Sequence, residues 1–294
     1  MKVGVVIPTA QGREENLMEV LASLRKQTCP LDNVIVVCDG FQIDRGLPEA
    51  FPEVKFYATQ WKHEPGMEQP RNVGTRLLRY TSDCSHVWFL DSDVIVAEDA
   101  LEHILQALEA HQDEDAIVVA PYDWLPPGIR KELPELRNDP RWVSFDQYDP
   151  TEIRRHDLAA GLACFSGNLV WPINEFVRVG GFWSEIHHGR CEDGELGIRA
   201  VAMDVPICFA RGARGWHLDH PVNTGLAIER NARDVPMLND RHPWMEQGAV
   251  FMVDRDGKAF DVKCWWCGET VPTIGWWDHA DSCGCPLPAI PVST

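Results

Sequence analysis

Two aspartates follow an apolar run in the segment HVWFLDSDVIV. Asp91 and Asp93 come directly after Val87–Leu90, which reads as a buried strand. Because a buried charge is costly unless something pairs with it, these carboxylates need a partner. They either cap the next helix or hold a hard divalent cation such as Mg²⁺ or Mn²⁺.

A second acidic pair lies in CEDGELGIRA, where Glu192 and Asp193 precede a predicted helix over Gly194–Ala202. These acids either favour the positive end of the helix dipole, or one of them is a general base beside a metal ion. His217 and His220 follow in RGWHLDHPVN. A lone histidine is more often a core residue than a ligand, but two histidines flanking an aspartate carry more weight.

An arginine also occupies a position suited to anion binding. PRNVG places Arg71 and Asn72 at the start of a predicted helix, Gln69–Tyr80. An arginine at a helix N-terminus that faces a crevice would bind phosphate oxygens. The alternative is a solvated surface arginine, and PRNVG taken alone favours it.

Strands and helices alternate through the first half of the chain. The predicted strands are Val3–Pro8, Val34–Cys38, Val54–Ala58, Val87–Leu90 and Ile117–Ala120, and the predicted helices are Gly12–Thr28, Gln69–Tyr80 and Glu98–His111. This alternation predicts βαβ units and a parallel sheet, in which ligands bind outside the carboxyl ends of the strands. Residues 122–157 lack periodicity, and we expect a structured loop over that crevice.

Several motifs together resemble family 2 glycosyltransferases with the GT-A fold. VVIPTAQGREENLMEVLASLRKQ, VIVVCDG, PRNVG, FLDSDV, GGF, CEDGELGIR and WHLDH occur in the order of that family, over about residues 1–220. The resemblance implies an α/β fold with a Rossmann-like, mostly parallel sheet flanked by helices. It also implies a nucleotide-sugar donor, usually a UDP-sugar, and a Mn²⁺ or Mg²⁺ ion at the aspartate motif.

The resemblance assigns the nucleotide side of the site residue by residue. Thr9 and Glu14 would lie near the nucleoside, and Asp39 would hydrogen-bond the uracil. Arg71, with Asn72 beside it, would approach the nucleotide and the diphosphate. PTAQGRE lacks the aromatic residue of the family's usual PTYNR segment, which puts the identity of the nucleotide in doubt.

The same resemblance assigns the metal ion and the chemistry. Asp91 would reach the ribose or a metal-bound water, and Asp93 would ligate the metal, as would His217, with His220 as the alternative. Asp193 matches the family's catalytic base and implies an inverting displacement at the anomeric carbon. The supporting or acceptor-binding group beside that base would be Glu192.

The C-terminal tail carries a second metal motif. Cys264, Cys267, His279 and Cys283 form a C-x2-C…H-x3-C set that fits a tetrahedral Zn²⁺ site, with Cys285 as a replacement for Cys283. We expect a small ββα zinc-finger module over residues 251–294. It either staples a lobe too small for its own core or docks the acceptor or a partner through its tryptophans.

Composition limits the remaining possibilities. The net charge of −18 disfavours broad nucleic-acid binding, and the apolar runs are too short to span a bilayer. The N-terminus lacks the features of a signal peptide, so we expect a cytoplasmic protein without stable membrane insertion.

The predicted organisation is a GT-A domain over residues 1–223, a linker over 224–250 and the zinc module. The domain divides into a nucleotide-sugar half, 1–121, and an acceptor and catalytic half, 122–223. The appendage suggests a macromolecular acceptor: a protein, a glycan or a modified DNA base. Two rivals to an active transferase are a catalytically inactive nucleotide-sugar or partner-binding module of the same fold and a nucleotidyltransferase, for which TAQGREEN is a poor match.

Overall fold

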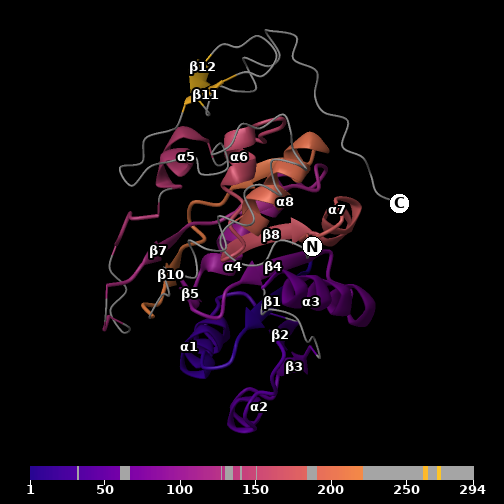
Figure 1. Cartoon of the computed structure of the whole chain (residues 1–294), viewed down its shortest axis with the longest axis vertical. Helices are drawn as coiled ribbons and strands as arrows, with labels where there is room; N and C mark the ends of the chain where they lie inside the picture. The colour runs from indigo at the N-terminus through magenta and orange to yellow at the C-terminus, as the bar shows by residue number, and fades with distance from the viewer. Residues whose placement is uncertain are drawn as a thin grey trace.

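The computed structural model describes residues 1–31, 33–59, 67–126, 128–129, 135–139, 141–149, 151–183, 191–220, 261–263 and 270–272 (Figure 1). The strands are β1 Val3–Thr9, β2 Val34–Cys38, β3 Val54–Ala58, β4 His86–Leu90, β5 Val94–Val96, β6 Ile117–Val119, β7 Tyr122–Trp124, β8 Asn168–Pro172, β9 Ile207–Phe209, β10 Gly215–His217, β11 Asp261–Lys263 and β12 Thr270–Pro272. The helices are α1 Glu14–Arg25, α2 Gly46–Ala50, α3 Glu68–Thr81, α4 Ala100–Ala110, α5 Trp142–Gln147, α6 Leu158–Leu162, α7 Ile173–Arg178 and α8 Cys191–Ala202.

The central sheet is buried on both faces, which explains its continuous apolar strands. Successive residues of a strand point to opposite faces, so Val6 of β1 packs with α3, α7 and α8. Its neighbours Val5 and Ile7 pack with α1 and α4 on the other face. The apolar side of α1 is buried there, and Leu17 and Val20 have no exposed surface.

The seven-stranded sheet has the order β3-β2-β1-β4-β8-β6-β9. Neighbouring strands of this sheet are parallel, except that β8 runs antiparallel to both β4 and β6. The predicted parallel sheet is therefore confirmed as mostly parallel. A second sheet, of order β5-β10-β7, lies at the carboxyl end of β4, because β5 begins only four residues after Leu90.

One sequence expectation was wrong, and one of two open alternatives is excluded. The stretch 122–157 is not simply a loop, because it contains β7 and α5, and Trp142 and Phe145 of α5 belong to the core. Its periodicity is hidden because these elements are only three and six residues long. Asp91 and Asp93 do not cap a helix, since β5 follows them and α4 has Asp99 at its N-cap position.

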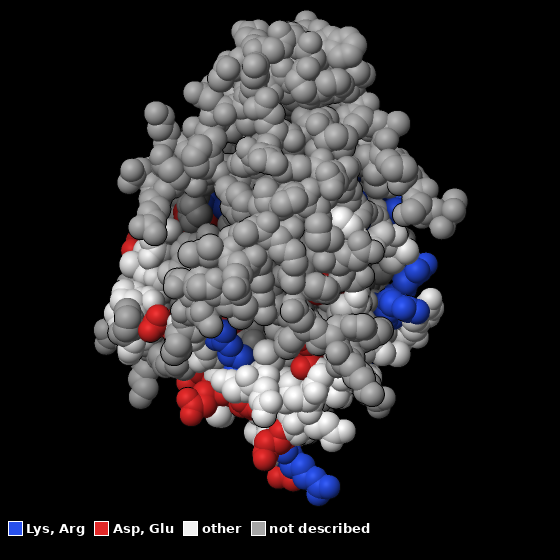
Figure 2. Space-filling model, viewed as in Figure 1, with Lys and Arg blue, Asp and Glu red and all other residues white. Residues whose placement is uncertain are grey.

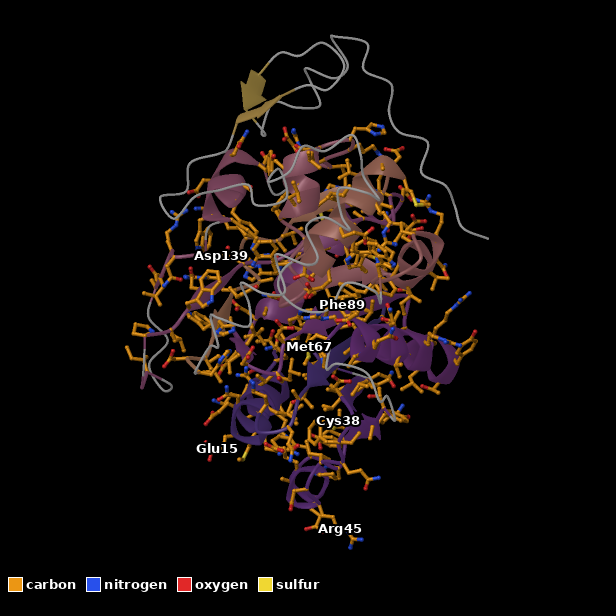
Figure 3. The ribbon with its side chains drawn as sticks, viewed as in Figure 1. Glu15, Cys38, Arg45, Met67, Phe89 and Asp139 are labelled. Atoms are coloured by element: carbon orange, nitrogen blue, oxygen red, sulfur yellow. The ribbon has the colours of Figure 1, made fainter. Side chains whose placement is uncertain are left out.

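Charge is unevenly placed on the surface. On the face shown in Figure 2, acidic side chains gather at the lower end of the molecule, where α1 and α2 lie in Figure 1. Figure 3 shows the side chains on the ribbon, with Phe89 of β4 near the middle and Arg45, just before α2, at the lower tip.

The tail is described only as a hairpin, in which β11 pairs antiparallel with β12. The predicted zinc ligands Cys264, Cys267, His279 and Cys283 lie outside the described residues, as does the predicted linker 224–250. Among the described helices, none combines the length and apolar character needed to cross a membrane.

Candidate active site

Three predicted metal ligands meet at the carboxyl end of β4. One ligand atom each of Asp93, His217 and His220 lies within 4.8 Å of the other two. Nε2 of His217 is 3.5 Å from Oδ1 of Asp93, and Nε2 of His220 is 3.1 Å from Oδ2 of the same carboxylate. A carboxylate with two imidazoles fits a divalent ion that accepts mixed oxygen and nitrogen ligands, such as Mn²⁺.

Backbone pairing explains why residues so distant in sequence meet. β10 pairs antiparallel with β5, which places His217 opposite Val94. The amide of Leu218 then donates to the carbonyl of Asp93 at 2.7 Å. The structure thus brings together both histidines that the sequence offered as alternatives.

The carboxylate of Asp93 is held ionised by its neighbours. Burial alone would raise its pKa, but a hydrogen bond from His220 and the nearby charges of His217 and Arg13 outweigh burial and lower the pKa below its usual value. Nη1 of Arg13 lies 3.4 Å from Oδ2 of Asp93. The sequence reasoning missed Arg13, although its place in the turn after β1 puts it at the same edge as the aspartates.

A second cluster surrounds the buried arginine of α3. Arg71 is only 3% exposed, so it is not a solvated surface residue. Its Nη2 donates to Oδ1 of Asp91 at 2.6 Å, and its Nη1 lies 3.8 Å from Oε1 of Glu192. Burial would lower the pKa of Arg71, but the charges of Asp91, Asp193 and Glu192 raise it overall, and the guanidinium stays charged. Met67, labelled in Figure 3, is the N-cap residue of α3, the helix that carries Arg71.

Asp193 has the properties of a general base poised near neutral pH. Burial first, and then the charge of Glu192, raise its pKa to about 7, while Arg71 and the hydroxyl of Ser166 oppose the rise. Among the residues that the structure describes, its buried Oδ1 has no hydrogen-bond partner. The pKa of Glu192 is raised as well, mainly by burial. Both acids lie in the first turn of α8, so the helix dipole also acts on them.

The predicted nucleoside residues lie at the ends of β1 and β2. Thr9 is 1% exposed and its hydroxyl has no partner in the described protein. The amide of Asp39 donates to the carbonyl of Thr9 at 2.9 Å, and the hydroxyl of Thr59 lies 3.4 Å from Oδ1 of Asp39. Glu14, half-buried, begins α1 beside this pair. These groups are brought together, and their contact with a nucleoside stays a prediction.

Asn72 has a different position from its neighbour Arg71. Its side-chain nitrogen donates to the carbonyl of Phe182 at 2.8 Å, and its oxygen accepts from the amide of Phe182 at 2.9 Å. Arg199 of α8 binds the carbonyl of Gly181 from the other side, at 2.6 Å. Asn72 therefore ties the turn before α8 to α3, and its predicted contact with the donor is untested.

Three further residues near the site were missed by the sequence reasoning. Ser166 has no exposed surface and faces Asp193. Tyr122 and Trp124 of β7 lie beside His217, with ring centroids 6.3 and 6.4 Å from the imidazole. The available signal was the aromatic pair in YDW, but without the pairing of β7 with β10 nothing placed it at the metal ligands.

Comparisons with known proteins agree with this geometry. A family model described as Glycosyl transferase family 2 matches residues 4–184. No curated protein matches the chain at a significant level.

Solved structures of S. aureus TarS resemble the chain in fold. TarS 1–349 has a TM-score of 0.55 at 18% identity, covering 74% of this chain and 60% of that one. Its complex with UDP has a TM-score of 0.56 at 18% identity, covering 80% and 65%. Its complex with UDP-GlcNAc has a TM-score of 0.55 at 18% identity, covering 76% and 60%. The chain therefore spans less than two thirds of TarS 1–349.

Proposed function

The chain belongs to glycosyl transferase family 2, and we propose that it moves a sugar from a UDP-sugar to an acceptor hydroxyl with Asp193 as the general base. The observation that carries this proposal is the convergence of Asp93, His217 and His220 at the carboxyl end of β4. The pKa of Asp193, raised to about 7, supports its role as the base. UDP-GlcNAc is the first donor to test, because TarS binds it.

The proposed donor site runs along the carboxyl ends of the strands. Thr9 and Asp39 would bind the nucleoside, since both present polar groups where β1 and β2 end. Asp93, His217 and His220 would hold a divalent cation, which when bound would neutralise charge on the diphosphate. Arg13 adds a positive charge beside Asp93 and would bind the same phosphate oxygens.

The proposed chemistry is a single displacement. Asp193 accepts the proton of the acceptor hydroxyl while the hydroxyl oxygen bonds to the anomeric carbon. The bond from that carbon to the diphosphate oxygen breaks, and its electron pair leaves with UDP. Attack from the face opposite the leaving group inverts the anomeric configuration. Glu192 would support Asp193, because both carboxylates interact with the guanidinium of Arg71.

The test is release of UDP from UDP-GlcNAc with Mn²⁺, with and without a panel of acceptor glycans. Wild type should release UDP, and Asp93→Asn should lose the Mn²⁺ dependence. Asp193→Asn should retain UDP binding by calorimetry but lose transfer by about 10²–10³-fold, the cost typical of removing a group that acts in the transition state.

Asp113→Asn, at an exposed turn, is the matched control and should behave as wild type. UDP binding without release under any condition would favour the inactive binding module. Equal transfer rates for wild type and Asp193→Asn would refute the assigned base.

A further inference from the structure

Trp124 is a partly exposed indole next to the metal-ligand cluster. Parallel pairing of β7 with β10 places it directly opposite His217. Its ring centroid is 6.4 Å from the imidazole of His217 and 5.6 Å from the ring of Tyr122. Trp88 and Trp171, by contrast, have no exposed surface. Trp124 therefore keeps an apolar ring at the edge of the site that the core does not fully cover.

The side chain of Asn138 fixes the backbone of Trp124 by two hydrogen bonds. The amide of Trp124 donates to Oδ1 of Asn138 at 2.7 Å, and its carbonyl accepts from Nδ2 of Asn138 at 2.9 Å. Asn138 is itself anchored, because its amide donates to the buried carboxylate of Asp123 at 2.8 Å. The side chain of Asn138 thus takes the place of a further strand along the edge of β7. An aromatic ring on a fixed backbone loses little conformational freedom when a ligand binds.

Trp124 belongs to the second sheet, whereas the nucleoside residues follow strands of the central sheet. β1 and β2, which end at Thr9 and near Asp39, lie on one side of β4. β5 continues from β4, and β10 and β7 follow in the second sheet, with Asp93 just before β5. A diphosphate held at Asp93 with its nucleoside toward β1 would therefore direct its sugar end toward β7.

We propose that the indole of Trp124 is a stacking surface for a pyranose ring beside the transferred bond. One face of a pyranose carries mainly C–H groups, and aromatic rings bury such apolar faces while leaving the hydroxyl groups to hydrogen-bond elsewhere. This inference rests on the proposed function. The pyranose is either the sugar of the donor or the terminal sugar of a glycan acceptor, and the experiment distinguishes the two.

The variants are Trp124→Ala, Trp124→Phe and Tyr57→Ala. Tyr57 is the matched control. It is a partly buried aromatic residue on β3, an edge strand of the central sheet, whereas Trp124 lies in the second sheet. Three quantities are measured with Mn²⁺ present: the affinity for UDP by calorimetry, KM for hydrolysis of UDP-GlcNAc, and binding of methyl β-glucopyranoside and cellobiose by saturation-transfer NMR. Glycerol, a polyol without a pyranose ring, is the control ligand.

Trp124→Ala should leave the affinity for UDP within about twofold of wild type. In the two sugar measurements, Trp124→Phe should fall between wild type and Trp124→Ala. If the donor sugar stacks on Trp124, KM for UDP-GlcNAc rises by about tenfold, the equivalent of one lost aromatic contact. If an acceptor sugar stacks there, that KM is unchanged and the NMR signal of the glucosides is lost.

Two results would overturn the stacking role. One is a Trp124→Ala enzyme that differs from wild type no more than Tyr57→Ala in both sugar measurements. The other is a wild type that neither hydrolyses UDP-GlcNAc nor binds the glucosides. A wild type that binds glucosides through Trp124 but does not bind UDP would instead refute the proposed function alone.

Discussion

Replacing Asp193 by asparagine should increase the stability of the protein at alkaline pH while it removes transfer. An ordinary aspartate titrates at 3.8, whereas burial and the charge of Glu192 raise the pKa of Asp193 to about 7. In the unfolded chain this carboxyl is therefore ionised above about pH 4, but in the folded protein it stays protonated until about pH 7. The folded state loses stability as the pH rises between these two values.

The expected magnitude follows from that difference. At 1.36 kcal/mol per pH unit, the distance from 3.8 to about 7 corresponds to about 4 kcal/mol at pH 8. An amide must still be buried in place of the carboxylate, so we expect about half of this, ~2 kcal/mol. For a chain of this size ~2 kcal/mol raises Tm by about 4 °C.

The assay is a thermal melt of wild type and Asp193→Asn at pH 8 and pH 5. Tm of the variant should exceed that of wild type at pH 8, and the gain should shrink toward pH 5, where the wild-type carboxyl is neutral in the folded state. Asp113→Asn should show no gain at either pH. A gain of equal size at both pH values, or a lower Tm at pH 8, would refute the reasoning that Asp193 carries a costly charge.

Three further outcomes test the same cluster. The rate of transfer should fall about tenfold per pH unit below pH 7, because only ionised Asp193 accepts a proton. Glu192→Gln should move this limb of the pH profile about one unit lower, because it removes the adjacent negative charge. Ser166→Ala should move the limb to higher pH, since the hydroxyl that favours the ionised form is lost; an unchanged profile would exclude that contact. Arg71→Leu should lower the free energy of unfolding in urea by about 3–5 kcal/mol, because it leaves the buried carboxylate of Glu192 and the partly buried carboxylate of Asp91 without their shared cation. Arg76→Leu, exposed on the same helix, should change that free energy by less than about 0.5 kcal/mol.

The half of the fold that contains β1 to β4 could be predicted from the sequence because its signals are local. The strand Val34–Cys38 and the strand Val54–Ala58 have the predicted bounds. The first is an uninterrupted apolar run, and the second is apolar apart from Lys55. The carboxyl ends of such strands must meet at one edge, so Asp39 and Asp93 could be assigned to a site without coordinates.

The second half of the fold could not be predicted from the sequence in the same way. β5, β7 and β10 are three residues each, too short for a period to show. Their positions depend on pairing between residues more than 90 apart, such as Trp124 with His217 and Val94 with His217. Ser166 and Trp124 enter the site only through that pairing and through the packing of α8. No local pattern in the sequence distinguishes them from surface or core residues.

The cluster around Arg71 links the proposed catalytic base to an expected cost in stability. Asp91, Glu192 and Asp193 surround one buried guanidinium, and the pKa of Glu192 is raised along with that of Asp193. A fold selected for stability alone would place apolar residues at such positions. One cation shared among several carboxylates instead leaves Asp193 with incomplete compensation, and that deficit raises its pKa toward neutrality. The basicity needed for proton transfer and the loss of folding stability therefore have one physical origin, so a substitution that relieves the second should weaken the first.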